Sequence, residues 1–275
     1  MFLIVQLWGI FVAIQILRNS AHYGLSNQPI EFTWSSLFVL IVVGVLFFLA
    51  VRYGRNFGSH LLRIALALAI FSGSQIALIS ITNILWTDIL SLLLVVLFFS
   101  FNKVFIQNIA VILALVGVGS ILGLSLSPII VVIVLVVMSF YDIWSVYVTK
   151  HMVVLAKGMI QAGAIFGFVI PVANRDFFAN TKDMTPGSSP HSSNECGDKC
   201  SMILGSGDVV FPLVLAASVA RVSLSGAIVV AIFSSVGLWV THLLFVNQPE
   251  RRAMAALPPI AVMSILGYLF FLFLI

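Results

Sequence analysis

The chain has 275 residues, of which 61% are hydrophobic and only 8% are charged. Soluble domains carry about 25% charged residues, so this composition excludes a soluble globular domain. The formal net charge of +4 is small, and in a membrane protein a basic excess indicates cytoplasmic loops and not a nucleic-acid partner.

Apolar stretches long enough to cross a bilayer recur along the whole chain. A bilayer core requires about 20 mostly apolar residues per helix. The first stretch has no basic segment before it and no small-residue cleavage site after it, so we interpret it as a retained span. An all-α polytopic membrane protein with nine transmembrane helices is therefore predicted, with spans at residues 2–17, 34–51, 61–81, 84–100, 106–124, 128–148, 201–220, 223–246 and 257–275.

One long connection divides the chain. Residues 1–148 hold six predicted spans, residues 149–200 form the connection, and residues 201–275 hold three spans. The connection begins with KHMVVLAKGMIQ, which favours a short interfacial helix, continues with the apolar GAIFGFVIPV, and ends in a stretch rich in Ser, Asn, Gly and Pro that is typical of a flexible loop.

Basic residues set the orientation of these spans. With nine spans, one side of the membrane holds only Arg18 and Arg221. The positive-inside rule then places the N-terminus and the 149–200 loop in the cytoplasm and the C-terminus outside. The cytoplasmic side holds the other basic residues: Arg52, Arg55, Arg63, Lys103, Lys150, Lys157, Arg175, Lys182, Lys199, Arg251 and Arg252.

Two acidic residues stand apart from the others. Asp142 and Asp208 lie well inside apolar runs, where a carboxyl group costs several kcal/mol unless it is neutralised or paired, so both are candidates for function. The remaining acids fall in loops or near span ends and are interpreted as solvated or interfacial charges: Glu31, Asp88, Asp176, Asp183, Glu195, Asp198 and Glu250.

The two aspartates are predicted to lie at one depth. Asp142 precedes Lys150 by eight residues, and Asp208 follows Lys199 by nine, on spans that run in opposite directions. At about 1.5 Å per helical residue, each carboxyl group lies roughly 12–13 Å from its cytoplasmic lysine.

Small and polar residues surround both aspartates. Gly205 and Gly207 remove side-chain bulk next to Asp208, which lets a second helix or a substrate approach closely. Ser139 and Ser145 lie three residues on either side of Asp142 and give that helix face a polar stripe.

The ninth span begins with two prolines. Pro258 and Pro259 remove two backbone donors and restrict the residue before them, which predicts an extended Leu257 at the start of the span. The alternative is that the prolines simply occupy the first helical turn, where proline is common.

These motifs together resemble the presenilin and signal peptide peptidase family, and the archaeal presenilin homologues most closely. The resemblance rests on YD at 141–142, GSGD at 205–208 and ALPP at 256–259, in that order over nearly the whole chain. The sequence departs from the family at Ala255, where the usual residue is proline. Signal peptide peptidases have the inverted topology, so the charge distribution favours the presenilin orientation.

The resemblance implies a presenilin-like fold and an intramembrane aspartyl endopeptidase that cleaves transmembrane substrates within the lipid bilayer, with no cofactor and no bound metal. Asp142 and Asp208 correspond to the catalytic aspartates. Leu257–Pro259 and Ala164–Val172 are candidates for pairing with an unwound substrate as an added strand. The residues expected to shape the active site are Tyr141, Gly205, Gly207, Ala256, Leu257 and Pro258.

Three other interpretations account for parts of the sequence pattern. An ion channel or transporter would use the acidic pair as a cation site. A prepilin-type peptidase also uses GxGD, but it typically carries a lysine two positions after the aspartate, where this chain has Val210. His191, Cys196 and Cys200 have only loose spacing for a zinc site, so free cytoplasmic thiols are the preferred interpretation.

The predicted loop gives a first test. In oriented membrane vesicles, a membrane-impermeant thiol reagent should modify Cys196 and Cys200 from the cytoplasmic side, because the polar stretch around them cannot bury enough apolar surface to fold. Modification from the opposite side alone would refute the loop assignment and the predicted topology together.

Overall fold

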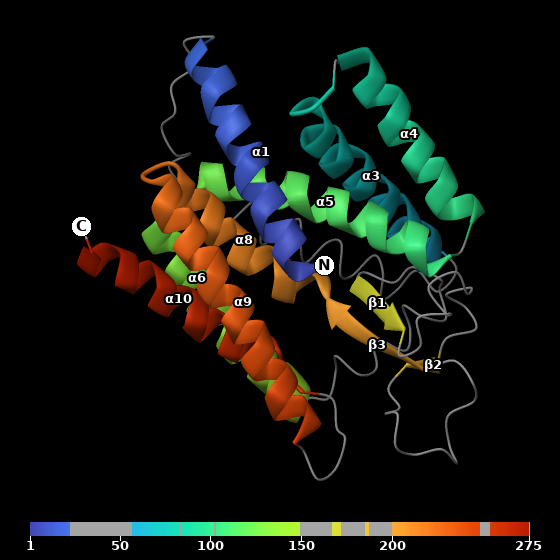
Figure 1. The fold of residues 1–275 in the computed structure, drawn as a ribbon. Coiled ribbons are helices and arrows are strands. Elements are labelled where there is room, and N and C mark those ends of the chain that lie inside the picture. The colour runs from blue at the N-terminus through green and yellow to red at the C-terminus, as the bar shows by residue number, and fades with distance from the viewer. Residues whose placement is uncertain are drawn as a thin grey trace.

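The computed structural model describes residues 1–22, 57–82, 84–101, 103–148, 167–171, 185–186, 200–247 and 254–274. This part of the chain forms eight α-helices, one short π-helix (η1, Trp144–Val148) and one three-stranded sheet (Figure 1). The helices are α1 Phe2–His22, α3 Phe57–Ile79, α4 Ile84–Ser100, α5 Val104–Ser125, α6 Pro128–Ile143, α8 Ser206–Ala220, α9 Leu224–Val246 and α10 Leu257–Leu274.

The helices match the apolar pattern of the sequence. Four of the described segments are long and apolar enough to cross a membrane, namely Phe2–Asn19, Val104–Ser125, Pro128–Val148 and Leu224–Val246. Four shorter apolar helices coincide with the other predicted spans: Arg63–Ile79, Leu85–Ser100, Ser206–Ala220 and Leu257–Phe273. The predicted span 34–51 and the predicted interfacial helix at 150–161 lie outside the described residues.

The prediction of one continuous helix over 201–220 is wrong. Residues Cys200–Gly205 form strand β3, and α8 begins only at Ser206. The backbone changes conformation at Gly205, which has extended torsion angles (φ −61°, ψ 141°) and caps the helix. Non-helical backbone at membrane depth is tolerated where protein buries it and satisfies its hydrogen bonds.

A small sheet supplies those hydrogen bonds. Strand β3 lies in the middle of the order β1-β3-β2. It pairs antiparallel with β1 (Gly167–Pro171), in a register that places Gly167 opposite Gly205. It also pairs in parallel with the two-residue strand β2 (Thr185–Pro186). The apolar segment expected to be extended therefore does contain a strand, but that strand pairs within the protein.

The core around the sheet joins it to the helices. Phe168 of β1 is 1% exposed and belongs to the same buried cluster as Val209 and Leu213 of α8 and Ile260 of α10. Strand β1 also packs on α5. Because these side chains come from three separate segments, burying them fixes the sheet against the helix starts that follow it in the chain.

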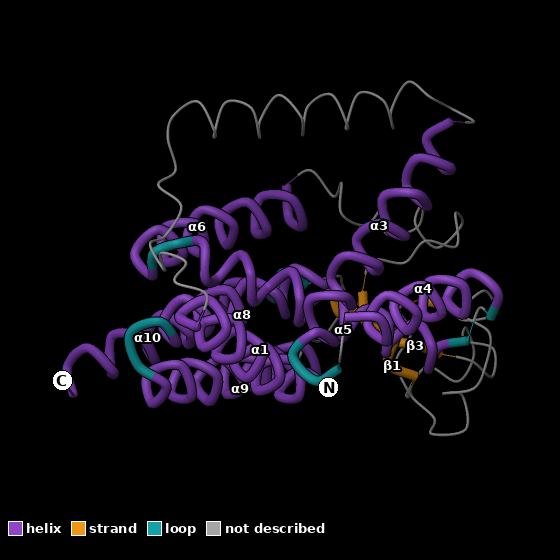
Figure 2. The backbone as a smooth tube through the Cα atoms, turned by 90° about the horizontal axis from the view of Figure 1, so that it is seen from above, coloured by secondary structure: helices purple, strands orange, loops and turns teal. Residues whose placement is uncertain are grey.

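Helix α5 runs through the middle of the fold. It packs against α3 on one side and against α1 and α8 on the other, and α4 covers α3 (Figure 1). Helices α9 and α10 form the most extensive helix pair, and α6 packs on α10 and α8. Figure 2 shows α6 at the edge of this group, beside α8 and α10.

Glycines allow the closest helix contact. A Cβ atom on Gly73 of α3 would lie 2.5 Å from the carbonyl oxygen of Ala114, and one on Gly117 of α5 would overlap the carbonyl oxygen of Gly73. Two backbones therefore meet here with no side chain between them, as is common for small residues at membrane helix contacts.

This contact predicts a clear loss of stability for Gly117→Ala. Overpacking costs about 1–3 kcal/mol, which exceeds the gain of about 1 kcal/mol in helix propensity when alanine replaces glycine. Thermal unfolding in detergent measures the effect. The control is Leu122→Ala, at a 44% exposed position of the same helix, which should change the midpoint little. An unchanged or higher midpoint for Gly117→Ala would show that the helices can separate without cost.

Candidate functional site

The first aspartate of the site, Asp142, lies near the end of α6, two residues before the π-helical turn η1. Its side chain is only 8% exposed. One carboxylate oxygen, Oδ2, accepts a hydrogen bond from the backbone N–H of Leu257 at 3.3 Å. The donor belongs to the first residue of α10, so this bond links the end of one helix to the beginning of another.

The start of α10 corrects one prediction. Leu257 is the first helical residue, and residues 254–256 before it have no regular structure, so the prolines lie in the first turn and do not keep Leu257 extended. The first N–H groups of a helix have no partner within it. Since Pro258 and Pro259 have no N–H, Leu257 supplies the donor of this turn that faces Asp142.

The second aspartate, Asp208, is the third residue of α8. Its carboxylate lies beside the backbone N–H of Gly205, the capping residue of the same helix. This arrangement resembles the capping box, in which an acidic side chain in the first turn satisfies the N–H of the cap. A Cβ atom on Gly205 would lie 3.1 Å from Asp208 Oδ2, so the glycine leaves room for the carboxylate.

The structure brings the two aspartates together. Helices α6, α8 and α10 pack against one another, and the carboxyl groups of Asp142 and Asp208 are close enough to interact electrostatically. Each group also lies beside a backbone N–H at a helix start, where the helix dipole favours negative charge. The arrangement therefore presents two oriented carboxyl groups in largely apolar surroundings, which suits proton transfer between paired acids.

The other residues predicted to shape the site have different environments. Tyr141 is 54% exposed and lies on the outer face of α6. Leu257 is buried, whereas Ala256 and Pro258 are half-buried. A Cβ on Gly207 would meet only the ring of Phe211 at 3.5 Å, an ordinary contact.

The serines of the predicted polar stripe also differ. Ser139 donates to the carbonyl of Leu135 in its own helix at 2.8 Å. Ser145 is buried in the π-helical turn, at 3% exposure. Ala255, the position at which the sequence departs from the pattern expected from the resemblance, is buried at 4% exposure.

One polar contact beside Asp208 was not predicted. Gln6 of α1 is fully buried, and its Nε2 donates to the carbonyl of Val209 at 3.1 Å. The sequence signal was an amide side chain within the otherwise apolar stretch 2–17.

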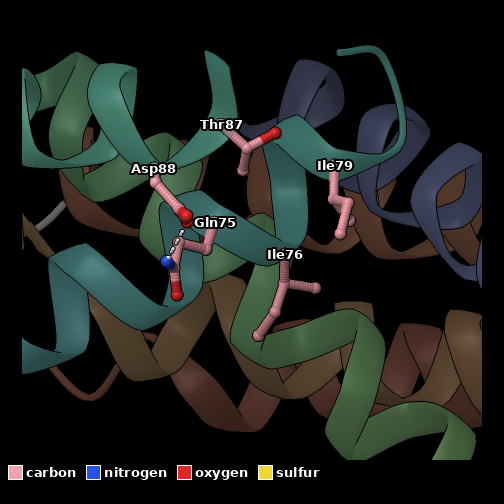
Figure 3. A pocket seen from close by; sticks show the side chains of 5 residues that line it. All are labelled: Gln75, Ile76, Ile79, Thr87 and Asp88. Atoms are coloured by element: carbon pink, nitrogen blue, oxygen red, sulfur yellow. Dashed lines mark hydrogen bonds between the residues drawn. The ribbon is translucent and has the colours of Figure 1, made fainter. Parts of the chain in front are cut away.

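A separate cavity lies between α3 and α4 (Figure 3). It has a volume of about 240 Å³, and Gln75 on its wall donates a 2.7 Å hydrogen bond from Nε2 to Asp88 Oδ1. It includes neither Asp142 nor Asp208, and Asp88 is exposed. Its lining residues are Gln75, Ile76, Ile79, Thr87 and Asp88.

Among the residues that the structure describes, no three His, Cys, Asp or Glu side chains come together to hold a metal ion. His191 and Cys196 lie outside that part of the chain.

Comparisons with known proteins identify the family and the fold. The family model described as "Signal-peptide peptidase, presenilin aspartyl protease" matches residues 1–275. No curated protein matches the chain. Two crystal structures of a presenilin family intramembrane aspartate protease, in space groups C222 and P2, share the fold with a TM-score of 0.60 and 24% sequence identity. Each alignment covers 98% of this chain, and 93% and 97% of the respective crystallised chains.

Proposed function

The chain belongs to the signal-peptide peptidase and presenilin family of aspartyl proteases, and we propose that Asp142 and Asp208 are the catalytic pair with which it hydrolyses peptide bonds inside the transmembrane helices of its substrates. The observation that carries this proposal is the meeting of two carboxyl groups from α6 and α8, each beside a backbone N–H at a helix start. The channel or transporter and the prepilin-type peptidase are set aside because the family model covers the whole chain.

Two neighbouring carboxyl groups provide a base and an acid at once. Like charges at short distance disfavour double ionisation, so the pair retains one proton between its members. The ionised carboxylate takes a proton from water as that water attacks the peptide carbonyl. The protonated carboxyl donates to the developing oxyanion, and proton transfer to the amine nitrogen then completes cleavage. The titration belongs to the pair as a unit.

The backbone donors orient this chemistry. A carboxylate with one oxygen bound to an N–H has less rotational freedom, and small misplacements of a reacting group can cost about 100-fold in rate. The Leu257 N–H binds Asp142, and the Gly205 N–H lies where it can orient Asp208 in the same way. Neither residue carries the reaction, yet both determine where the carboxyl oxygens point.

Substrate binding requires a second surface. A transmembrane substrate must unwind before water can reach its peptide bonds, and its freed backbone groups then need new partners. We assign this role to the side of β3 that faces away from β1. Within the described residues, β2 covers only Cys200 and Ser201 on that side, and the rest of the strand leads directly to Asp208. Strand addition of this kind provides main-chain hydrogen bonds to an extended peptide.

The same proposal includes the membrane arrangement. The protein is an integral membrane protease, and we place its N-terminus and the 149–200 loop in the cytoplasm and its C-terminus outside, following the charge distribution. In this arrangement the six spans of residues 1–148 include the helix that carries Asp142. The three spans of residues 201–275 include the helix that carries Asp208 and the start of α10. The partners are transmembrane proteins or peptides.

Neutralising either aspartate should abolish proteolysis. Asp142→Asn and Asp208→Asn each remove the ability to exchange a proton, and general acid–base groups contribute about 10²–10⁴ in rate. Cleavage of a single-span substrate by purified protein measures the loss, and thermal unfolding should show an intact fold. The matched control is Asp88→Asn, at the exposed acid of α4, which should cleave normally. Near-normal cleavage by either of the first two variants would eliminate the proposed pair.

The Leu257 N–H can be tested apart from its side chain. Leu257→Pro removes the donor to Asp142 at a helix position where proline is well tolerated. Leu257→Ala keeps the donor but removes buried apolar volume, which costs about 2–5 kcal/mol of stability. We expect kcat to fall by roughly 10- to 100-fold in the proline variant and by much less in the alanine variant. Equal kcat values in the two variants would show that the N–H does not orient Asp142.

A further inference from the structure

We infer that Gln6 of α1 is a positioning residue for Asp208, which it holds in place through the backbone of α8. This inference rests on the proposed catalytic pair. Gln6 is fully buried, and its Nε2 donates to the carbonyl oxygen of Val209 at 3.1 Å. Val209 follows Asp208 directly, so the amide of α1 holds the turn of α8 that carries the carboxylate.

The first turns of α8 need such a contact because of a proline inside the helix. Pro212 has no N–H, and the residue four positions before it is Asp208. The Asp208 carbonyl therefore loses its regular helical donor, and the proline ring crowds it. The turn bearing Asp208 is thus tied less firmly to the rest of α8 than an ordinary helical turn, and Gln6 provides a tie from outside the helix.

Fold stability alone does not explain a glutamine at this position. The second polar atom of the side chain, Oε1, is buried and has no hydrogen-bond partner among the described residues. A buried polar atom without a partner is destabilising, whereas methionine would fill a similar volume without that penalty. Loss of Gln6 would not leave the Val209 carbonyl without a hydrogen-bond donor, because the N–H of Leu213 is its regular donor within α8. The unpaired Oε1 therefore lowers the free energy of unfolding, while the Nε2 of the same amide fixes the backbone beside Asp208.

The test compares four purified variants with the unmodified protein, using cleavage of a single-span substrate. Gln6→Met should lower kcat by about 10- to 100-fold, since misplacement of a catalytic group acts on the chemical step, and should leave KM within about twofold. Its thermal midpoint should be unchanged or higher. Normal kcat in Gln6→Met, or a fall in kcat matched by a fall in thermal midpoint, would overturn the inference.

Ser120→Ala is the matched control. Ser120 of α5 also makes a buried hydrogen bond between its side chain and a helix backbone, and its hydroxyl proton is shared between the carbonyl of Gly9 in α1 at 2.8 Å and that of Val116 in α5 at 2.6 Å. This bond is not next to an aspartate of the site, so its loss should lower the thermal midpoint and leave kcat unchanged. A fall in kcat equal to that of Gln6→Met would show that any loosening of α1 has the same effect, and would also overturn the inference.

Gln6→Glu gives a second route if the methionine variant does not fold. The introduced carboxyl group has an O–H donor for the Val209 carbonyl only when it is protonated. The ratio of its kcat to that of the unmodified protein should therefore rise as the pH falls, and a constant ratio would contradict the inference. Asp208→Asn is measured in parallel. Activity in that variant would refute the catalytic pair itself, whereas inactivity there with normal Gln6 variants would refute only the positioning role.

Discussion

The hydrogen bond from the Leu257 N–H to Asp142 meets the requirement on which this fold depends, which is a donor for each buried carboxyl group. A carboxyl group in apolar surroundings needs donors, yet a continuous helix uses nearly all of its N–H groups internally. Spare N–H groups remain only at helix starts. A protein that keeps two carboxyl groups within its helical bundle must therefore bring helix starts to them, and here α8 and α10 both begin beside the pair.

The two helix starts are built by different means. The start of α10 follows a segment without regular structure, and two prolines in its first turn remove donors that would otherwise need partners. The start of α8 follows a strand that is hydrogen-bonded to β1 along one edge. Phe168 then ties that strand to the core cluster shared with Val209 and Ile260. The sheet and the helix bundle are thus parts of one packed unit.

The sequence was sufficient for features that depend on composition or on local chemistry. Hydropathy located each described helix, and the cost of burying a carboxyl group singled out Asp142 and Asp208. The sequence was insufficient where two alternative local structures have similar free energies. The run SMILG suits a buried strand as well as the start of a span, and only the distant partner β1 decides between them. The two prolines likewise permit both an extended Leu257 and a helix start. Gln6 was missed because its partner, the Val209 carbonyl, lies 203 residues away.

Strand β3 passes into α8 at Gly205 with no intervening loop. A loop would absorb small shifts of the strand, but this junction transmits them undiminished. One step along a strand is about 3.3 Å, so a slip of one residue against β1 would carry Asp208 by about the length of a hydrogen bond and turn every β3 side chain to the opposite face. The register that pairs Gly167 with Gly205 therefore determines the position of the Asp208 carboxylate along the axis of β3.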